Sequence, residues 1–178
     1  ARRPRRVRLA MTIDLFVFDI AGTTVRDDGV VLGAFRRTMA SHGLVADDAW
    51  IKWRMGWDKV RVFGEALGMN GKDPSAAPAL ADRFTAEIRL SMDAAPPVPL
   101  PGASSAIRSL RERGVRIAFN TGYSTHLARE IVSRVGWEPD AVVGSDLVAQ
   151  GRPAPDMIRL AMAQTGVSDP ARVGVAGD

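Results

Sequence analysis

Cysteine is absent from the 178-residue sequence, which also holds only two histidines, three lysines and one tyrosine. The absence of cysteine excludes disulfide frameworks, thiolate zinc sites and cysteine nucleophiles. No hydrophobic run approaches the ~18 residues that a membrane span needs, so no membrane partner is expected. Hydrophobic residues nevertheless make up 46% of the chain, which is enough for a packed core and excludes global disorder.

The formal net charge of +4 is unevenly distributed. Five of the 24 basic residues and none of the 20 acidic residues lie in residues 1–10, so the rest of the chain carries 19 basic and 20 acidic residues. We interpret residues 1–10 as a basic disordered leader ahead of Met11. The remaining chain is close to neutral, and we therefore expect no nucleic-acid partner.

Hydrophobic periodicity divides the rest of the sequence into two kinds of segment. The run at 13–18 reads as a buried strand that ends at Asp19, whereas residues 29–98 contain helical spacing and no strand pattern. Within that block we expect helices at 30–42, 47–55, 58–67 and 79–92, with a loop at 68–78. After it, helices are expected at 103–113, 125–135 and 155–165, alternating with strands at 115–120, 141–144 and 172–176.

This alternation predicts an α/β fold with a parallel sheet covered on both faces. We expect a Rossmann-type core formed by residues 11–28 and 99–178, interrupted by an inserted all-α cap at residues 29–98. The cap would be joined to the core by a flexible crossing near residues 26–29 and by the proline-rich segment 94–102, in which four prolines favour an extended chain.

Ligands of an open parallel sheet gather at the carboxyl ends of its strands. The predicted loops at that edge contain Asp19-Ile-Ala-Gly-Thr-Thr24, Thr121-Gly-Tyr123, Ser145-Asp146 with Gly151-Arg-Pro153, and Gly177-Asp178. Two carboxylates from neighbouring strand ends can converge on Mg²⁺, which prefers oxygen ligands. Backbone N–H groups of a glycine-containing loop, a threonine hydroxyl and an arginine can form a phosphate cradle.

The order and spacing of these motifs resemble the haloacid dehalogenase (HAD) superfamily. Phe18-Asp19-Ile-Ala-Gly-Thr-Thr-Val25 resembles its first motif and Thr121 its second, while Arg152 and Gly177-Asp178 resemble the third and fourth. The resemblance extends over essentially all of the sequence after Met11. It implies a HAD-like core with a helical cap.

Within that superfamily the sequence is similar to the phosphonoacetaldehyde hydrolase (phosphonatase) family and its phosphonatase-like relatives. Most HAD phosphatases have a second aspartate where this chain has Ala21, and arginine replaces the usual lysine of the third motif. Met55-Gly-Trp-Asp-Lys59 matches the family's Met-Gly-x-x-Lys, whose lysine forms a Schiff base with the substrate aldehyde. Thr121-Gly-Tyr123 and Gly151-Arg-Pro153 also match.

The pairing of an alanine with a lysine has a chemical reason. Cleavage of a P–C bond leaves a carbanion, which no carboxylic acid at the position of Ala21 could usefully protonate in advance. An iminium on the neighbouring carbon can instead take up the electron pair, so that the product leaves as an enamine. Lys59 must be neutral to attack an aldehyde, and burial beside Met55 and Trp57 or a nearby cation would lower its pKa, whereas Asp58 would oppose that change.

The resemblance implies roles for individual residues. Asp19 is the expected nucleophile, forming an aspartyl-phosphate, and Lys59 the expected Schiff-base amine. Mg²⁺ is the implied cofactor, held by Asp19, the carbonyl of Ala21 and Asp178. The substrate, a small phosphorylated or phosphonate compound, is expected to contact these residues: Ala21, Gly22, Thr23, Met55, Gly56, Thr121, Gly122, Tyr123 and Arg152.

Two alternatives stay open. The chain can instead be a small-molecule phosphomonoesterase of the phosphoglycolate-phosphatase kind, in which Lys59 binds its substrate electrostatically, or a non-catalytic HAD-like binding protein. The family's proton-shuttling histidine, three residues after the lysine, is Val62 here, and neither His42 nor His126 can be assigned to replace it. Lys59 itself has a simpler interpretation, as a solvated lysine on the first turn of a helix.

Other expectations concern the whole protein. HAD cores continue past the fourth motif with another metal-site aspartate, a strand and a helix, so the sequence predicts a core that is truncated after Asp178. We also expect a cytoplasmic protein, and a homodimer formed through the cap.

Overall fold

The computed structural model describes residues 12–177, which form an α/β fold built on a parallel four-stranded sheet. The strands are β1 (Leu15–Phe18), β2 (Arg116–Thr121), β3 (Ala141–Gly144) and β4 (Val173–Ala176), in the order β3-β2-β1-β4. All three neighbouring pairs are parallel. The predicted fold class and all four predicted strands are confirmed, whereas the predicted leader at residues 1–10 lies outside the described residues.

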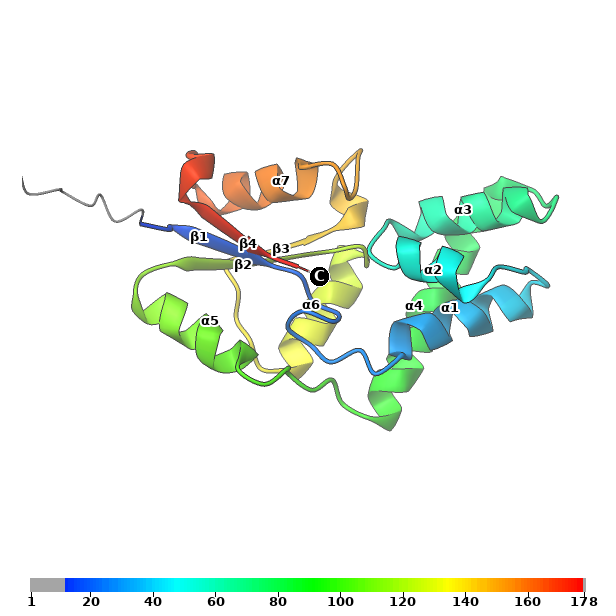
Figure 1. Cartoon of the computed structure of the whole chain (residues 1–178), viewed down its shortest axis with the longest axis horizontal. Helices are drawn as coiled ribbons and strands as arrows, with labels where there is room; N and C mark the ends of the chain where they lie inside the picture. Colours follow the sequence, from blue (N-terminus) through cyan, green and yellow to red (C-terminus); the bar gives the residue numbers. More distant parts are fainter. Residues whose placement is uncertain (1–11, 178) are drawn as a thin grey trace, which may run out of the picture.

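Helices cover both faces of the sheet (Figure 1). On one face lie α5 (Ala103–Glu112) and α6 (Thr125–Arg134), and on the other lies α7 (Asp156–Thr165). The apolar clusters follow the same division, because alternate residues of a strand point to opposite faces. Leu15 and Val17 of β1 pack with Met157 of α7, and other strand residues face α5 and α6.

The remaining four α-helices follow β1 and lie together beyond the carboxyl ends of the strands (Figure 1). They are α1 (Val30–Ser41), α2 (Asp48–Arg54), α3 (Lys59–Met69) and α4 (Ala77–Ala94), and we call them the helical insert. Phe35, Phe63 and Phe84, each fully buried, join α1, α3 and α4 through ring centroids 4.7–6.1 Å apart.

The helical insert differs from expectation in its longest loop. α3 continues to Met69 and α4 begins at Ala77, so the predicted loop at 68–78 is shorter and includes a 3₁₀ turn at Pro74–Ala76. Proline is tolerated in the first turn of a helix, where its missing N–H has no partner to lose. Pro78 therefore lies in the first turn of α4 instead of ending the loop. There are two further 3₁₀ turns: Ser145–Leu147 follows β3, and Pro170–Arg172 precedes β4.

Two chain crossings connect the sheet to the helical insert, and they lie against each other. The Arg26 N–H donates to the Val98 carbonyl oxygen at 2.9 Å, and Val25 pairs with Pro99 in an antiparallel bridge. The division of the chain into a core and a cap at these positions stays a prediction.

The strand order places a switch point between β1 and β4, because the chain first proceeds from β1 to β2 and β3 and then crosses to the other side of β1. Ligand sites of open α/β sheets lie at the carboxyl ends beside such a point. Asp19 follows β1 there, and its N–H donates to the Ala176 carbonyl oxygen of β4 at 2.9 Å. Within residues 12–177, no helix is long and apolar enough to cross a membrane.

Candidate active site

A cavity of about 90 Å³ lies between the carboxyl ends of β1 and β2 and the helical insert. Ten of the twelve residues around it were predicted from the sequence. It is lined by Asp19, Ala21, Gly22, Asp27, Val31, Met55, Gly56, Lys59, Thr121, Gly122, Tyr123 and Arg152. We call it the catalytic cavity, after the role that we propose for it. Its walls come from segments more than 100 residues apart, which the fold brings together.

Asp19 is held by the tight loop that follows β1. Its side chain is almost fully buried, and Oδ1 accepts a hydrogen bond from the Ile20 N–H at 2.7 Å. The Thr24 hydroxyl donates to the Asp19 carbonyl oxygen at 2.7 Å, and Gly22 adopts the left-handed conformation (φ 81°) that turns the chain. The loop therefore fixes the Asp19 carboxylate at the edge of the sheet.

Arg152 forms an ion pair with Asp19, with 3.0 Å between Nη2 and Oδ1. The same Nη2 donates to both the carbonyl oxygen and the side-chain Oδ1 of Asn120, at 2.8 and 2.6 Å. Asn120 belongs to β2, is buried, and was not singled out in the sequence. A buried amide at the end of an apolar strand is the only signal that could have indicated it.

Lys59 is the first residue of α3, and its side chain is buried with 5% exposed. The amino group donates to three carbonyl oxygens: those of Met55 at 2.8 Å, Trp57 at 2.7 Å and Gly122 at 3.1 Å. The first two belong to the helical insert and the third to the loop after β2. The interpretation of Lys59 as a solvated surface lysine is therefore wrong.

Burial dominates the acid–base behaviour of Lys59 and lowers its pKa from 10.5 to about 7. The carboxylates of Asp58 and Asp19 raise the pKa, while the Arg152 guanidinium lowers it. Three aromatic rings add a further influence, because the Lys59 Nζ lies 5.4–5.6 Å from the ring centroids of Phe35, Phe84 and Tyr123. Such contacts favour the ammonium form.

Asp58 connects the helical insert to the sheet. Its Oδ1 accepts from the Arg61 N–H at 2.8 Å and so caps α3, while its Oδ2 accepts from the Ser145 hydroxyl at 2.9 Å. Ser145 follows β3 in the sheet. Asp58, the neighbour of Lys59, therefore links the helical insert to the loop after β3 by a hydrogen bond.

Gly122 marks the closest approach of the loop after β2 to the helical insert. A Cβ atom there would lie 2.4 Å from the Gly56 carbonyl oxygen and 2.5 Å from that of Trp57. Both obstacles are backbone atoms, which cannot turn aside as a side chain would. Glycine is thus required at position 122 for the observed contact.

Thr121 and Tyr123 flank that glycine and are both buried. The Tyr123 N–H donates to the Thr121 hydroxyl oxygen at 3.3 Å. Burial raises the pKa of the Tyr123 phenol, and the carboxylates of Asp27 and Asp19 raise it further. Tyr123 therefore presents a protonated hydroxyl near neutral pH, and its ring also packs against Phe84 with 6.2 Å between centroids.

Asp27 and Val31 line the catalytic cavity although the sequence reasoning missed them. The Val31 N–H donates to Asp27 Oδ1 at 2.8 Å, so Asp27 satisfies a donor in the first turn of α1. An aspartate shortly before a helix start is a recognisable capping signal. Nothing in the sequence indicated that the same residue also reaches the cavity.

Two of the predicted site residues do not join this group. Thr23 does not line the catalytic cavity, and its buried hydroxyl has no hydrogen-bond partner among the described residues. Asp178 lies outside the described residues. Of the histidines, His42 and His126 are exposed, and Val62 lies fully buried in the apolar core, away from any proton-transfer role.

The donors that could hold Mg²⁺ are hard oxygen atoms. Within residues 12–177 no group of three or more His, Cys, Asp or Glu side chains could hold a metal ion. The Asp19 carboxylate is nevertheless at the strand end, and Ala21 lines the same cavity. This set fits Mg²⁺, which binds through one or two carboxylates and keeps several waters.

Comparisons with known proteins agree with this geometry. Residues 13–178 match the family model described as haloacid dehalogenase-like hydrolase. The chain is 29% identical over 178 residues to a phosphonoacetaldehyde hydrolase of Bordetella avium, and the match covers 90% of this chain but 63% of that protein. It is 26% identical to the probable phosphatase IndB of Dickeya dadantii, over 92% of this chain and 72% of that protein.

A similar fold occurs in the crystal structure of CbbY from Rhodobacter sphaeroides in complex with phosphate. The TM-score is 0.78 at 21% identity, and the match covers 92% of this chain and 77% of that one. The family match extends over the strands, the helical insert and the loops that form the catalytic cavity. The chain therefore belongs to the haloacid dehalogenase-like hydrolases.

Proposed function

We propose that the protein is a phosphonatase-like hydrolase that cleaves the P–C bond of phosphonoacetaldehyde or a similar phosphonate. The observation that carries this proposal is that the buried amino group of Lys59 and the carboxylate of Asp19 line one small cavity. An amine and a carboxylate nucleophile are the two groups that this chemistry requires. The phosphonoacetaldehyde hydrolase of Bordetella avium among the relatives supports the same choice.

Lys59 supplies the electron sink. Burial lowers the pKa of Lys59 to about 7, so its amino group has a neutral form near neutral pH that is able to attack an aldehyde carbonyl. Loss of water and uptake of a proton give an iminium on the carbon next to the phosphonate-bearing carbon. When the P–C bond breaks, its electron pair moves into this iminium and yields an enamine.

Asp19 attacks phosphorus in the same step. The carboxylate oxygen forms a P–O bond as the P–C bond breaks, which leaves an aspartyl-phosphate. Arg152 would exchange its ion pair with Asp19 for the phosphoryl oxygens, held in position by its two hydrogen bonds to Asn120. Thr121 and the backbone of Gly122 complete the phosphoryl contacts.

Water completes the cycle in two places. One water hydrolyses the aspartyl-phosphate and releases phosphate. The enamine takes up a proton, and a second water hydrolyses the resulting iminium to release acetaldehyde, neutral Lys59 and a proton. Because Ala21 replaces the usual general acid, no group in this position protonates a leaving alkoxide, which suits a carbon leaving group better than an oxygen one.

Mg²⁺ would be held by Asp19, the Ala21 carbonyl and Asp178, and would neutralise negative charge near the phosphoryl group.

We further propose that residues 29–98 act as a cap that closes over the substrate. The contact of Lys59 with the Gly122 carbonyl oxygen supports this role, since it joins the helical insert to the sheet. A homodimer through the cap stays a prediction. Trp53 of the helical insert, 74% exposed, offers an apolar side chain for such a contact.

A phosphomonoesterase is the second candidate. The three carbonyl acceptors around Lys59 suit an ammonium group that attracts a phosphate without reacting with it. The resemblance to the probable phosphatase IndB favours this alternative as well. The third possibility, a binding protein without activity, is opposed by the buried Asp19 nucleophile at the strand end.

Product analysis separates these functions. The protein that carries this chain is incubated with Mg²⁺ and either phosphonoacetaldehyde or phosphoglycolate, and phosphate and acetaldehyde are measured. We expect both products from phosphonoacetaldehyde and a loss of at least 10³-fold in Lys59→Arg, because a guanidinium keeps the charge but forms no Schiff base. Lys52→Arg, an exposed lysine of the helical insert, is the matched control and should keep full activity.

Phosphoglycolate hydrolysis that survives Lys59→Arg, without cleavage of the phosphonate, would support the phosphomonoesterase instead. No turnover of either compound by a protein that binds phosphate would favour the binding protein.

A further inference from the structure

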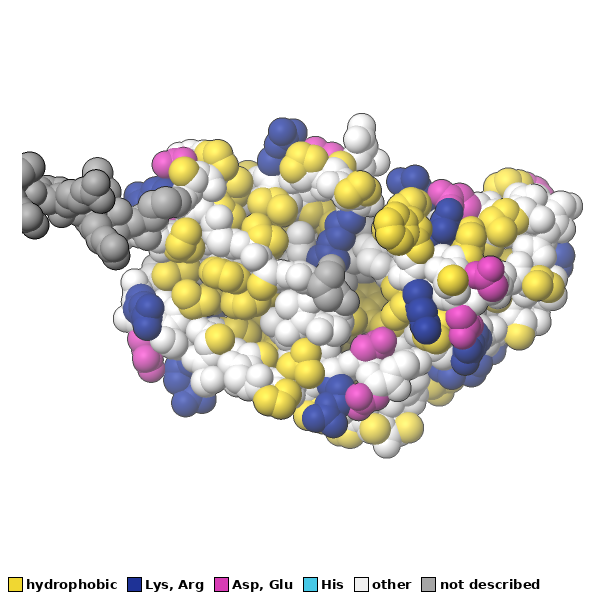
Figure 2. Space-filling view, viewed as in Figure 1, with side chains coloured by type: hydrophobic (Ala, Val, Ile, Leu, Met, Phe, Trp, Pro, Cys, Tyr) yellow, Lys and Arg dark blue, Asp and Glu magenta, His cyan; other side chains and the backbone are white. Residues whose placement is uncertain are grey.

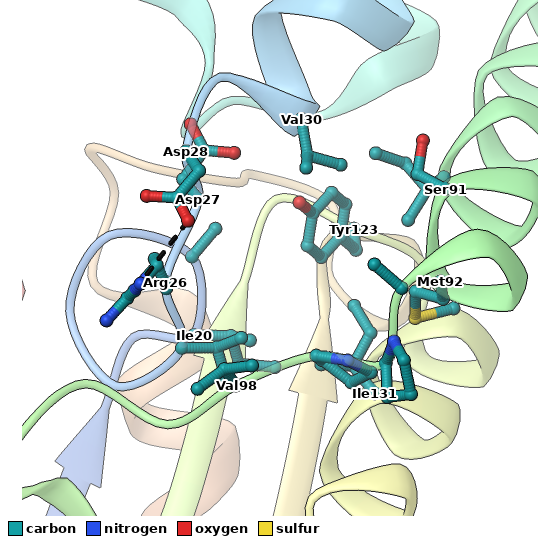
Figure 3. Close-up of a pocket in the computed structure, with 16 residues that line it drawn as sticks. Ile20, Arg26, Asp27, Asp28, Val30, Ser91, Met92, Val98, Tyr123 and Ile131 are labelled. Carbon is teal, nitrogen blue, oxygen red and sulfur yellow. Dashed lines mark ion pairs between the residues drawn. The ribbon is translucent and has the colours of Figure 1, made fainter.

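A second cavity lies between the two chain crossings that connect the sheet to the helical insert (Figure 3). Its volume is about 250 Å³, and we call it the hinge pocket. One wall is formed by residues 25–28 and Val30 and another by residues 95–98, while α4 and α6 contribute Met92 and Ile131. The pocket is therefore bounded by the segments that any movement of the helical insert would change.

The lining of the hinge pocket is mainly apolar. Ile20, Ile88 and Ile131 form its buried side, and Val30 and Val98 stand at its mouth with 37% and 51% of their surface exposed. An apolar cavity of ~150 Å³ can bind benzene. The hinge pocket therefore has the size and the surface to hold a short aliphatic chain or one aromatic ring.

The hinge pocket adjoins the catalytic cavity. Ala21, Asp27 and Tyr123 line both spaces, so the two cavities meet at these residues. Figure 3 shows the Tyr123 ring beside Val30, with its hydroxyl turned toward the side of Asp27. The catalytic cavity, at about 90 Å³, has room for a phosphoryl group and only a short carbon fragment. The organic part of any larger substrate needs an adjoining space.

Charge fixes which end of a substrate would enter which space. Asp27 and Asp28 stand on one side of the hinge pocket, and Arg26 lies 3.7 Å from Asp28 in an exposed ion pair. An anionic group is disfavoured beside these two carboxylates. The catalytic cavity is lined by the carboxylates of Asp19 and Asp27, but it also contains the two basic side chains Arg152 and Lys59. A phosphoryl group would thus lie in the catalytic cavity, with an uncharged group in the hinge pocket.

We infer that the hinge pocket binds the apolar part of the substrate, and that the substrate is a phosphonate with an aliphatic or aromatic substituent larger than the two carbons of phosphonoacetaldehyde. This inference rests on the proposed function, because it assumes that the phosphoryl group binds beside Arg152. The two chain crossings that line the hinge pocket would then select the substrate, in addition to the residues that carry out the reaction.

A chain-length series tests the inference. Binding of methyl-, propyl-, butyl-, pentyl- and hexylphosphonate is measured by calorimetry on the full protein with Mg²⁺. Each methylene that enters the pocket should tighten binding up to about fourfold, which corresponds to ~0.8 kcal/mol per buried methylene. The gain should stop when the pocket is full.

Two variants place the gain in this pocket. Val98→Trp and Val30→Trp fill the mouth from opposite crossings, and either should reduce hexylphosphonate binding to the level of methylphosphonate. Methylphosphonate binding should stay unchanged in both, which also reports that they fold. Val45→Trp makes the same substitution at a residue that is 78% exposed and does not line the pocket, and it should bind as the wild type does.

Affinity that is flat across the series, or a gain that persists in both pocket variants, would overturn the inference and leave the proposed function standing. Binding that tightens with chain length in a protein without Schiff-base chemistry would support the pocket and reject P–C cleavage. Absence of binding by every phosphonate would overturn both.

Discussion

Lys59 is subject to opposing influences within a few ångströms. Three carbonyl oxygens and three aromatic rings stabilise its ammonium form, whereas burial with 5% exposure destabilises it. Burial has the largest effect and brings the pKa to about 7. The outcome is an amine that can hold a proton or react, depending on small changes around it.

The same shift predicts how stability depends on pH. The pKa of Lys59 is about 7 in the folded protein and about 10.5 in the unfolded chain, so unfolding takes up a proton between these values. The contribution of Lys59 to the free energy of unfolding should therefore rise with pH in this window, by up to about 1.4 kcal/mol per pH unit. Chemical denaturation of the wild type and Lys59→Met at pH 7 to 9.5 measures it.

Lys59→Met lacks the titrating amine and serves as the reference in that experiment. The wild type should gain stability relative to it as the pH rises. A difference between the two proteins that is constant from pH 7 to 9.5 would show that the lysine has the same pKa in both states.

Asn120 is the second residue whose role follows from its contacts. It gives Arg152 two acceptors, one from the backbone and one from the side chain. Asn120→Leu keeps the size and removes the side-chain acceptor, and a hydrogen bond to a charged group contributes about 1.5–3 kcal/mol. We expect methylphosphonate to bind roughly 10- to 100-fold more weakly, measured by calorimetry at pH 7. Unchanged affinity in a folded variant would mean that Arg152 needs no such support.

Among the elements, the loop after β2 and the segment between α2 and α3 determine how closely the helical insert approaches the sheet. Gly122 permits this approach, since a Cβ there would meet two backbone carbonyl oxygens at 2.4 and 2.5 Å. The same approach lets the Gly122 carbonyl oxygen accept a hydrogen bond from Lys59. The packing of the helical insert against the sheet and the position of the Lys59 amino group therefore both depend on the glycine at position 122.

Gly122→Ala should separate the helical insert from the sheet. We expect kcat/KM to fall by ~10-fold or more and the melting temperature to fall as well, because relieving the clash opens an apolar cluster that the helical insert and the sheet share. Steady-state kinetics and thermal unfolding measure the two effects.

Gly68→Ala is the matched control for this prediction. Gly68 lies in α3 with open space around it, so an added methyl group meets nothing and helix propensity favours alanine by up to ~1 kcal/mol. Activity should be unchanged and stability slightly higher. Wild-type activity in Gly122→Ala would contradict the role given to the close contact.

Most elements could be predicted because their periodicity is local. Strand runs such as residues 141–144 and helical spacing such as 103–113 depend only on neighbouring residues, and the structure confirms both. The start of α4 was missed, because Pro78 has the same composition signal in a loop as in the first turn of a helix.

The site was predictable to the extent that its residues belong to motifs. Asp19, Lys59 and Arg152 each stand in a recognisable stretch, and the structure brings them to one cavity. Asn120 and Asp27 are single polar residues whose roles arise only from contacts between distant segments. No spacing rule within the sequence could reveal such contacts.

At the scale of the whole molecule, the helical insert and the sheet meet at the carboxyl ends of the strands, where Figure 2 shows charged side chains of both signs around the junction. The two parts are joined by a pair of adjacent crossings and by the Asp58–Ser145 and Lys59–Gly122 hydrogen bonds. Asp19 comes from the sheet and Lys59 from the insert. The proposed reaction therefore needs both parts in contact.

Reductive trapping tests the central claim, that Lys59 forms a Schiff base with the substrate. The protein is treated with borohydride in the presence of phosphonoacetaldehyde, and the modified residue is located by mass spectrometry of its peptides. We predict an adduct on Lys59, none on Lys52 or Lys72, and a trapping rate that rises with pH through about 7. Release of phosphate from phosphonoacetaldehyde without any adduct on Lys59 would contradict the account.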